Sequence, residues 1–198
     1  MWEDRYSSTP GYLFGTDPAQ VLTENPWISE TAATALCVAD GEGRNAVHLA
    51  RLGLKVTTFD LAPTAVSRAR FLADDAGVAL TAHQSDWADW DFTQTFDLVV
   101  AIFIQFAGPA FRNRQFANLK QAVRPGGRLL LHGYRPEQIA LGTGGPPDGA
   151  NMYTTEMLAD AFSDWTIDRL AAYERDVQEG RGHVGTSALI DLVARRPA

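Results

Sequence analysis

Strand-like and helix-like segments alternate through most of this 198-residue chain, and this alternation constrains the fold more than any other feature. Short apolar segments are followed by segments of helical periodicity that end near glycine. Such alternation is typical of an open α/β sheet with parallel strands. Strands are expected at residues 36–39, 55–59, 78–84, 96–104 and 128–134, and helices at 44–52, 63–76, 111–123 and 154–162.

The last two expected strands, 165–173 and 187–194, have no helix between them. We therefore expect them to pair antiparallel at one edge of the sheet. The continuous apolar run from Phe96 to Ile104 predicts the central strand, because parallel strands are buried on both faces. The sequence thus predicts a single α/β domain of Rossmann-like type, with a mostly parallel sheet, helices on both faces and an antiparallel last strand.

Residues 1–30 stand outside the alternation and carry several aromatic side chains, among them Tyr6, Tyr12 and Phe14. This segment is equally compatible with an arm packed on the surface and with a lid over a binding site. We therefore divide the chain into an N-terminal arm or lid, residues 1–30, and a ligand-binding domain, residues 31–198.

Composition excludes several classes of function. The net charge of −7, without a long run of one sign, argues against a nucleic-acid partner. Cys37 is the single cysteine, so neither an internal disulfide nor a cysteine metal site is expected, and no metal ligand set is predicted. The longest apolar run is too short to cross a bilayer, and the first residues do not resemble a signal peptide. We expect a cytoplasmic protein with a small-molecule partner; the sequence leaves its oligomeric state open.

The segment Asp40-Gly41-Glu42-Gly43-Arg44-Asn45 lies between the first expected strand and the first expected helix. In an open α/β sheet this turn lies at the carboxyl ends of the strands, where ligands bind. Glycine permits close approach of the backbone, and the start of the helix offers free N–H groups to an anionic group. The turn therefore predicts a cofactor site.

Two acidic residues that follow later strands extend this site. Asp60 directly follows the second strand, at a spacing typical of a carboxylate that binds ribose hydroxyls. Because Gly41, Gly43 and Ala46 also fit the dinucleotide pattern, Asp60 is compatible with a nicotinamide cofactor as well. Asp86 and Trp87 follow the third strand, where a carboxylate and an indole suit an adenine ring. Trp87 is also compatible with simple packing in the core.

These segments, together with Phe96-Asp97-Leu98-Val99-Val100 and residues 119–127, resemble class I S-adenosylmethionine-dependent methyltransferases. The Gly-Glu-Gly-Arg-Asn turn and the tail from Glu179 to Gly185 are most similar to the branch of tellurite-resistance and thiopurine-type methyltransferases. The resemblance implies a seven-stranded sheet and S-adenosylmethionine as cofactor. Its implied cofactor residues are Asp40, Gly41, Gly43, Arg44, Asn45, Asp60, Leu61, Asp86, Trp87, Ala101 and Ile102.

Within this set the resemblance implies that Gly41 and Gly43 pass under the methionine part, that Asp60 holds the ribose and that Asp86 holds the adenine. The chain departs from the family at two positions. Where the family has an acidic residue near the end of the first strand and a glycine two positions later, this chain has Cys37 and Ala39.

The expected function is methyl transfer to a small molecule, with a thiol or a chalcogen oxyanion as acceptor, since soft nucleophiles need little proton management. Tyr134, Arg135 and His183 are the catalytic candidates on the acceptor side, with His183 expected in a loop between the last two strands. Two alternatives remain open: a non-catalytic regulator that binds S-adenosylmethionine, and a nicotinamide-dependent oxidoreductase.

Overall fold

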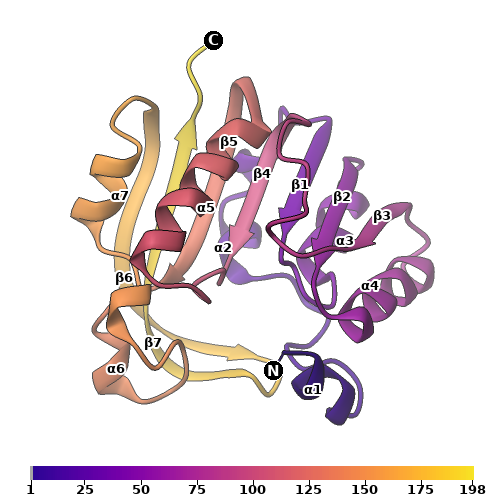
Figure 1. Ribbon diagram of the computed structural model, residues 1–198. Coiled ribbons are helices and arrows are strands. Elements are labelled where there is room, and N and C mark those ends of the chain that lie inside the picture. Colours follow the sequence, from indigo (N-terminus) through magenta and orange to yellow (C-terminus); the bar gives the residue numbers. More distant parts are fainter. Residues whose placement is uncertain (1) are drawn as a thin grey trace.

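The computed structural model describes residues 2–198 and contains one seven-stranded sheet. The strand order is β3-β2-β1-β4-β5-β7-β6 (Figure 1). The neighbouring pairs from β3 to β5 are all parallel, whereas β7 lies antiparallel between β5 and β6. The strands are β1 (Thr34–Val38), β2 (Lys55–Asp60), β3 (Leu80–Gln84), β4 (Phe96–Ile102), β5 (Val123–Tyr134), β6 (Thr166–Glu179) and β7 (His183–Arg195).

This arrangement confirms the predicted Rossmann-like α/β fold with an antiparallel last strand. Because the parallel strands run in one direction, their carboxyl ends meet at one edge of the sheet, which is the lower edge in Figure 1. The order of the chain reverses between β1 and β4, and such a switch point is where open α/β sheets bind ligands. Residues 2–8 of the arm and the tip of the β6–β7 hairpin both lie at this edge (Figure 1).

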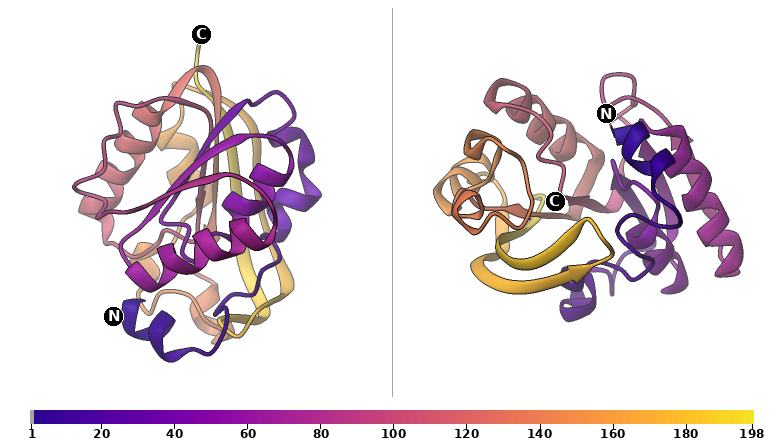
Figure 2. Two further views of the ribbon diagram at one scale, coloured as in Figure 1. Left: turned by 90° about the vertical axis from the view of Figure 1, so that its right-hand side faces the viewer. Right: turned by 90° about the horizontal axis from the view of Figure 1, so that it is seen from below.

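Helices cover both faces of the sheet (Figure 2). The helices α5 and α7 pack on one face, and α2 and α3 pack on the other. Proline stands at the first position of α4 and α5, where its missing N–H costs no helical hydrogen bond. The bounds are α1 (Trp2–Ser8), α2 (Gln20–Glu24), α3 (Arg44–Arg51), α4 (Pro63–Asp75), α5 (Pro109–Ala122), α6 (Gln138–Leu141) and α7 (Thr155–Ala161). Within residues 2–198 no helix has the length and apolar character needed to span a membrane.

Alternate residues of β1 enter different halves of the core, as the period of a strand requires. Leu36 and Val38 join the cluster under α5 and α7, while Ala35 and Cys37 join the cluster under α2 and α3. Cys37 is completely buried, which confirms its predicted place in a strand of the core. Burial also raises the pKa of its thiol, so the residue is an inert part of the packing.

The hairpin of β6 and β7 is longer than predicted, and its extra length changes the place of one site residue. The expected strands ended at residue 173 and began again at 187, with His183 in a loop. In the structure His183 is the first residue of β7 and pairs with Glu179 of β6. The tip is held because the N–H groups of Arg181 and Gly182 donate to the carbonyl of Leu13 in the arm. A tertiary contact therefore stabilises strand geometry that local sequence does not indicate.

Two strand boundaries near the centre of the sheet also differ from the prediction. β4 ends at Ile102, two residues early, because Phe103 adopts a left-handed backbone with φ of 56°. β5 begins at Val123 rather than at the expected residue 128, so it includes the Pro-Gly-Gly sequence that precedes the expected strand. Val123 pairs with Phe96 and Arg128 pairs with Leu98, so the extra residues form a bulge in β5 between these two pairs.

Candidate active site

The turn after β1 has the backbone of a ligand-binding loop. Ala39, Gly41 and Gly43 have φ values of 47°, 58° and 83°, all in the left-handed region. A Cβ atom on Gly43 would lie 2.6 Å from the Cβ of Ala69 on α4, so glycine is required at this position. The structure also explains why the family places glycine where this chain has Ala39, because a left-handed alanine costs roughly 1–2 kcal/mol.

Asp40 and Asn45 hold this turn together. The carboxylate of Asp40 accepts from Asn45 Nδ2 at 2.9 Å and from the N–H of Ala46 at 3.1 Å, at the start of α3. Asn45 Oδ1 in turn accepts from the N–H of Ala19. Burial raises the pKa of Asp40 to about 6, although the two hydrogen bonds oppose this shift. Both predicted cofactor residues therefore also have a structural role in the turn.

Asp60 lies at the end of β2, beside the turn. Its two carboxylate oxygens accept from the N–H groups of Gly41 and Ala62, each at 2.9 Å. Each oxygen retains a further lone pair, so the carboxylate can still accept from a ligand hydroxyl. The next residue, Leu61, is 57% exposed and offers an apolar surface next to Asp60. This geometry fits the ribose-binding role that the sequence predicts for Asp60.

The two residues after β3 lie in different environments. Trp87 is buried in the core, contacts Phe92 with ring centroids 5.0 Å apart, and donates its Nε1 hydrogen to Asn118 of α5. This placement corresponds to the core-packing alternative for the indole and does not present a free ring face for stacking. Asp86 is exposed, and its carboxylate accepts from the N–H of Ala88. Of the pair, Asp86 remains the candidate for an adenine contact.

The carboxyl end of β4 adjoins the turn at the switch point. Ala101 and Ile102 are both buried, so they form the floor of this region rather than an exposed wall. Phe103 follows with its left-handed backbone, which is a genuine outlier for a bulky residue. Strained residues of this kind concentrate at functional sites. The strain turns the Phe103 ring toward the end of β5 and the hairpin, where it contacts Tyr134 and His183.

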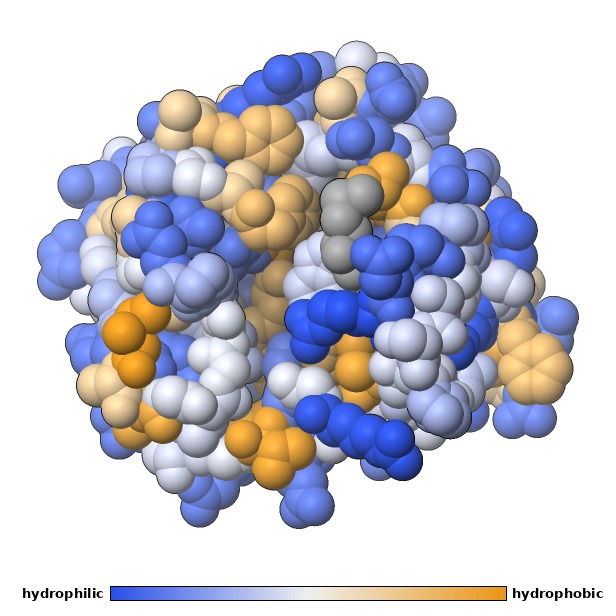
Figure 3. All heavy atoms as spheres, turned by 60° about the horizontal axis from the view of Figure 1, so that its bottom comes forward, coloured by the Kyte–Doolittle hydropathy of each residue, from blue (hydrophilic) through white to orange (hydrophobic). Residues whose placement is uncertain are grey.

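Four rings from distant parts of the chain meet here, and we call them the aromatic cluster: Phe14, Phe103, Tyr134 and His183. The centroid of His183 lies 4.5 Å from Phe14, 4.3 Å from Phe103 and 5.9 Å from Tyr134. Figure 3 shows that the face at this end of the molecule has a recess with apolar side chains along its floor. The three other rings surround His183 with apolar area, which suits an apolar acceptor.

His183 is also part of a buried ionic chain. Its Nδ1 lies 3.3 Å from Glu179 Oε2, and the same oxygen accepts from Arg44 at 2.6 Å. Although burial opposes it, the contacts with His183 and Arg44 lower the pKa of Glu179 to about 2. Burial lowers the pKa of His183 below its usual value, with Arg44 adding to the effect and Glu179 opposing it. The arrangement is therefore a neutral imidazole held by an ionised carboxylate, which is suited to accept a proton.

The two remaining predicted acceptor-side residues are Tyr134 and Arg135. The ring of Tyr134 is in the aromatic cluster, and burial, together with the charge of Glu179, raises its pKa well above the usual range. Tyr134 therefore remains a neutral phenol at physiological pH. Arg135, just beyond β5, forms an ion pair with Glu137 at 2.8 Å. Its charge is thus already compensated within the loop.

Arg44 points away from the turn that precedes it. Besides Glu179, its guanidinium donates to the carbonyls of Phe14 and Asp17 in the arm. The structure thus gives Arg44 the role of joining the turn, the arm and the hairpin.

Sequence reasoning missed several residues that the structure brings to the site. Glu42, the residue between the two glycines of the turn, accepts from the N–H of Leu13 and from Arg68. Tyr6 lies against Gly41, as a Cβ atom on that glycine would be 2.5 Å from its hydroxyl. The aromatic residues of the arm were the available signal, but their spacing does not show where the arm docks. The sequence around Phe103 does not indicate that its backbone is left-handed.

Comparisons with known proteins agree with this geometry. Residues 35–127 match a family model described as a methyltransferase domain, a span that runs from β1 to the Gly-Gly turn inside β5. This span includes the glycine turn, Asp60 and Asp86. No curated protein matches the chain.

Several solved structures share the whole fold. A protein studied for the conversion of a disulfide bond into a thioacetal group during echinomycin biosynthesis is 21% identical, with a TM-score of 0.78 over 99% of this chain and 91% of that chain. The N-methyltransferase NodS from Bradyrhizobium japonicum WM9, in complex with S-adenosyl-L-homocysteine, is 14% identical, with a TM-score of 0.75 over 100% and 97%. TehB from Haemophilus influenzae is 15% identical, with a TM-score of 0.73 over 98% of this chain and 65% of that chain.

The match to the methyltransferase family model covers residues 35–127, and the solved structures share the fold of nearly the whole chain. The structural relatives are too distant in sequence to name an acceptor.

Proposed function

We propose that the protein is an S-adenosylmethionine-dependent methyltransferase that acts on a small molecule, with a thiol as the accepting group. The observation that carries the proposal is the joint position of two features at one edge of the sheet: the glycine turn with Asp60, and the aromatic cluster with His183. The first feature suits a nucleoside cofactor and the second suits an acceptor. The resemblance of the turn supports the tellurite-resistance and thiopurine-type branch.

The residues present fit this cofactor. The turn has the positive φ angles of a loop that approaches a ligand closely, and Asp60 keeps free lone pairs beside it. When bound, S-adenosylmethionine supplies an electrophilic methyl group and leaves as S-adenosylhomocysteine. The turn would hold the methionine part, Asp60 the ribose and Asp86 the adenine.

The charges around the aromatic cluster favour a thiol over a chalcogen oxyanion. Arg44 is paired with Glu179, and Arg135 is paired with Glu137. His183 is neutral at pH 7, since burial lowers its pKa. An oxyanion would therefore gain little charge compensation from these three residues, whereas an uncharged thiol loses little on entering apolar surroundings. The fold shared with the protein from echinomycin biosynthesis, which concerns sulfur chemistry, is in keeping with this choice.

In the proposed reaction the chain positions the acceptor and removes its proton. The aromatic rings exclude water and hold the acceptor, while His183 takes the proton of the thiol. Glu179 orients the imidazole and stabilises the imidazolium that forms, because it is ionised and lies at hydrogen-bond distance. The bound cofactor would supply the methyl group that bonds to the acceptor sulfur, so the products would be a thioether, S-adenosylhomocysteine and one proton held by His183.

The test has two stages. Calorimetric titration with S-adenosylhomocysteine is expected to show one site, and Asp60→Asn is expected to weaken binding at least tenfold, since a hydrogen bond to a charged group contributes about 1.5–3 kcal/mol. Mass spectrometry of reactions with a panel of small thiols, selenite and tellurite then identifies the acceptor. Binding without turnover of any acceptor would favour a non-catalytic regulator, and an absence of binding would overturn the proposal.

A further inference from the structure

The arm contributes a buried tyrosine to the cofactor end of the site. We propose that Tyr6 is part of the cofactor site and that its hydroxyl hydrogen-bonds a ribose hydroxyl of the bound cofactor. This inference rests on the proposed function, and it assigns the arm a direct role in binding.

The position of Tyr6 is fixed by packing on the first turn of α4. Its ring is 5% exposed and belongs to an apolar cluster with Leu13, Ala62 and Ala65. Ala62 also donates its N–H to Asp60, so the tyrosine and the proposed ribose-binding carboxylate are supported by the same segment. The ring of Tyr6 therefore packs between α4 and the rest of the arm, next to the glycine turn that would hold the cofactor.

The hydroxyl of Tyr6 reaches the glycine turn. A Cβ atom on Gly41 would be 2.5 Å from the hydroxyl oxygen, closer than any real Cβ contact. Gly41 thus has a reason to be glycine that is independent of the cofactor, because a side chain there would displace Tyr6. The glycine turn and the arm are therefore complementary in shape where Tyr6 meets Gly41.

The chemistry of this hydroxyl points to a ligand. No hydrogen bond joins it to another of residues 2–198, and it is not among the fully buried polar atoms that lack a partner, so this donor is accessible to a ligand. Burial and the charges of Asp60, Glu42 and Asp40 raise its pKa far above the usual range, so it remains a donor at every physiological pH. Each ribose hydroxyl both donates and accepts, so it can donate to Asp60 and accept from Tyr6.

Anchors on both sides of Tyr6 hold the arm in this place. Before it, Glu3 accepts from the N–H and the hydroxyl of Thr64 on α4. After it, the N–H of Leu13 donates to Glu42 in the glycine turn at 2.7 Å. The tyrosine is therefore pre-organised, and it would not have to be ordered at the moment of binding.

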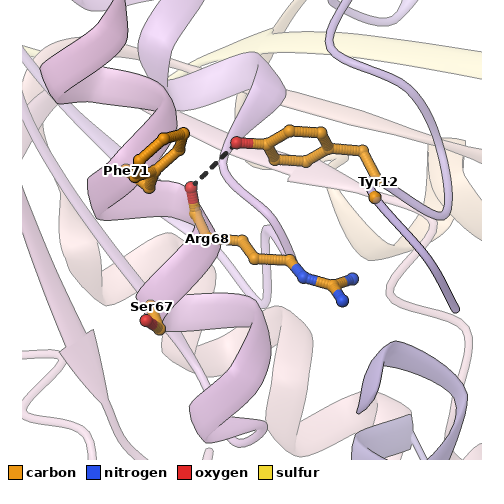
Figure 4. Close-up of a pocket in the computed structure, with 5 residues that line it drawn as sticks. Tyr12, Ser67, Arg68 and Phe71 are labelled. Atoms are coloured by element: carbon orange, nitrogen blue, oxygen red, sulfur yellow. Dashed lines mark hydrogen bonds between the residues drawn. The ribbon is translucent and has the colours of Figure 1, made fainter. Parts of the chain in front are cut away.

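The arm also carries a matched control. Tyr12 lies on the outer side of α4, in a shallow hollow of about 310 Å³ with Ser67 and Phe71. Figure 4 shows its hydroxyl directed at the carbonyl of Arg68, at 3.5 Å. Tyr12→Phe therefore removes a phenol from the same arm without touching the glycine turn.

The experiment measures the affinity of the full chain for S-adenosylhomocysteine by calorimetry in three proteins: wild type, Tyr6→Phe and Tyr12→Phe. Tyr6→Phe is expected to weaken binding roughly three- to tenfold, the effect of one hydrogen bond, and Tyr12→Phe is expected to leave it unchanged. Thermal midpoints without ligand are expected to agree among all three, which separates a binding role from a packing role.

Wild-type affinity in Tyr6→Phe, or an equal loss in Tyr12→Phe, would overturn the inference. If the wild-type protein itself does not bind S-adenosylhomocysteine, the proposed function fails instead. An analogue of S-adenosylhomocysteine without the two ribose hydroxyls tests whether the hydroxyl of Tyr6 contacts the ribose. The difference between wild type and Tyr6→Phe is expected to vanish with this analogue, and a persisting difference would overturn the ribose contact.

Discussion

Arg44 and Glu179 form an ion pair of 2.6 Å that joins the glycine turn to the tip of the β6–β7 hairpin, across 135 positions of the sequence. Both side chains are nearly buried, at 8% and 10% exposure. The same guanidinium holds the arm through the carbonyls of Phe14 and Asp17. One side chain therefore connects the cofactor end of the site, the acceptor end and the arm.

We predict that Arg44→Met destabilises the protein strongly. The substitution leaves the buried carboxylate of Glu179 without its charged partner and with only the neutral His183 beside it, and breaking a buried ion pair typically costs about 3–5 kcal/mol. The matched control is Arg175→Met, whose partner Glu24 is 48% exposed, and exposed pairs contribute only about 0–1 kcal/mol. Chemical denaturation followed by circular dichroism measures both. Equal losses in the two variants would show that the Arg44 pair contributes no more than a surface pair.

Asp86 provides a test of the adenine end. Its side chain is exposed and accepts one backbone hydrogen bond, from Ala88, so Asp86→Asn is expected to change the thermal midpoint little. If the carboxylate accepts the exocyclic amine of adenine, the variant binds S-adenosylhomocysteine about tenfold more weakly, since a charged hydrogen bond is lost. Calorimetric titration of the variant and of the wild type with S-adenosylhomocysteine measures this difference in affinity. Unaltered affinity would leave Asp86 as a turn residue only.

The pH dependence of turnover reports on His183. Because burial lowers its pKa, the acidic limb of kcat/KM is expected below about pH 6.5, the ordinary value for histidine. Glu179 raises the pKa of His183, so Glu179→Gln is expected to move this limb further toward acid. The same variant is expected to lower kcat, since it no longer stabilises the imidazolium. A limb that stays in place in Glu179→Gln would exclude His183 as the titrating base.

Asp40 gives a prediction for stability rather than for activity. Burial raises its pKa in the folded protein to about 6, above the value of about 3.9 expected for an unfolded chain. Between these two values the folded state binds more protons than the unfolded state, so this carboxyl stabilises the fold at low pH and the gain is lost as pH rises through 6. The stability of the wild type relative to Asp40→Asn is therefore expected to fall between pH 4 and pH 7. Parallel urea titrations of both proteins measure this difference, and a difference independent of pH would contradict it.

Much of the parallel part of the fold was predictable from local pattern. The apolar run of β4 and the β-branched residues of β2 indicated strands, because burial on both faces selects such residues. The glycine turn and Asp60 were predictable for a related reason: their roles depend on backbone geometry and on a short spacing along one β-α-β unit. The class of ligand followed from these residues and from the family resemblance that they carry.

Tertiary structure alone decided how the acceptor side is built. His183 lies in a strand because the arm holds the tip of the hairpin, and Phe103 turns toward His183 because its backbone is left-handed. Trp87 entered the core because α5 supplies a partner for its indole N–H. Each of these outcomes depends on contacts between segments that are far apart in the chain. Helical and strand periodicity are properties of neighbouring residues, so they determine the elements and the cofactor turn, whereas long-range packing determines which side chains meet.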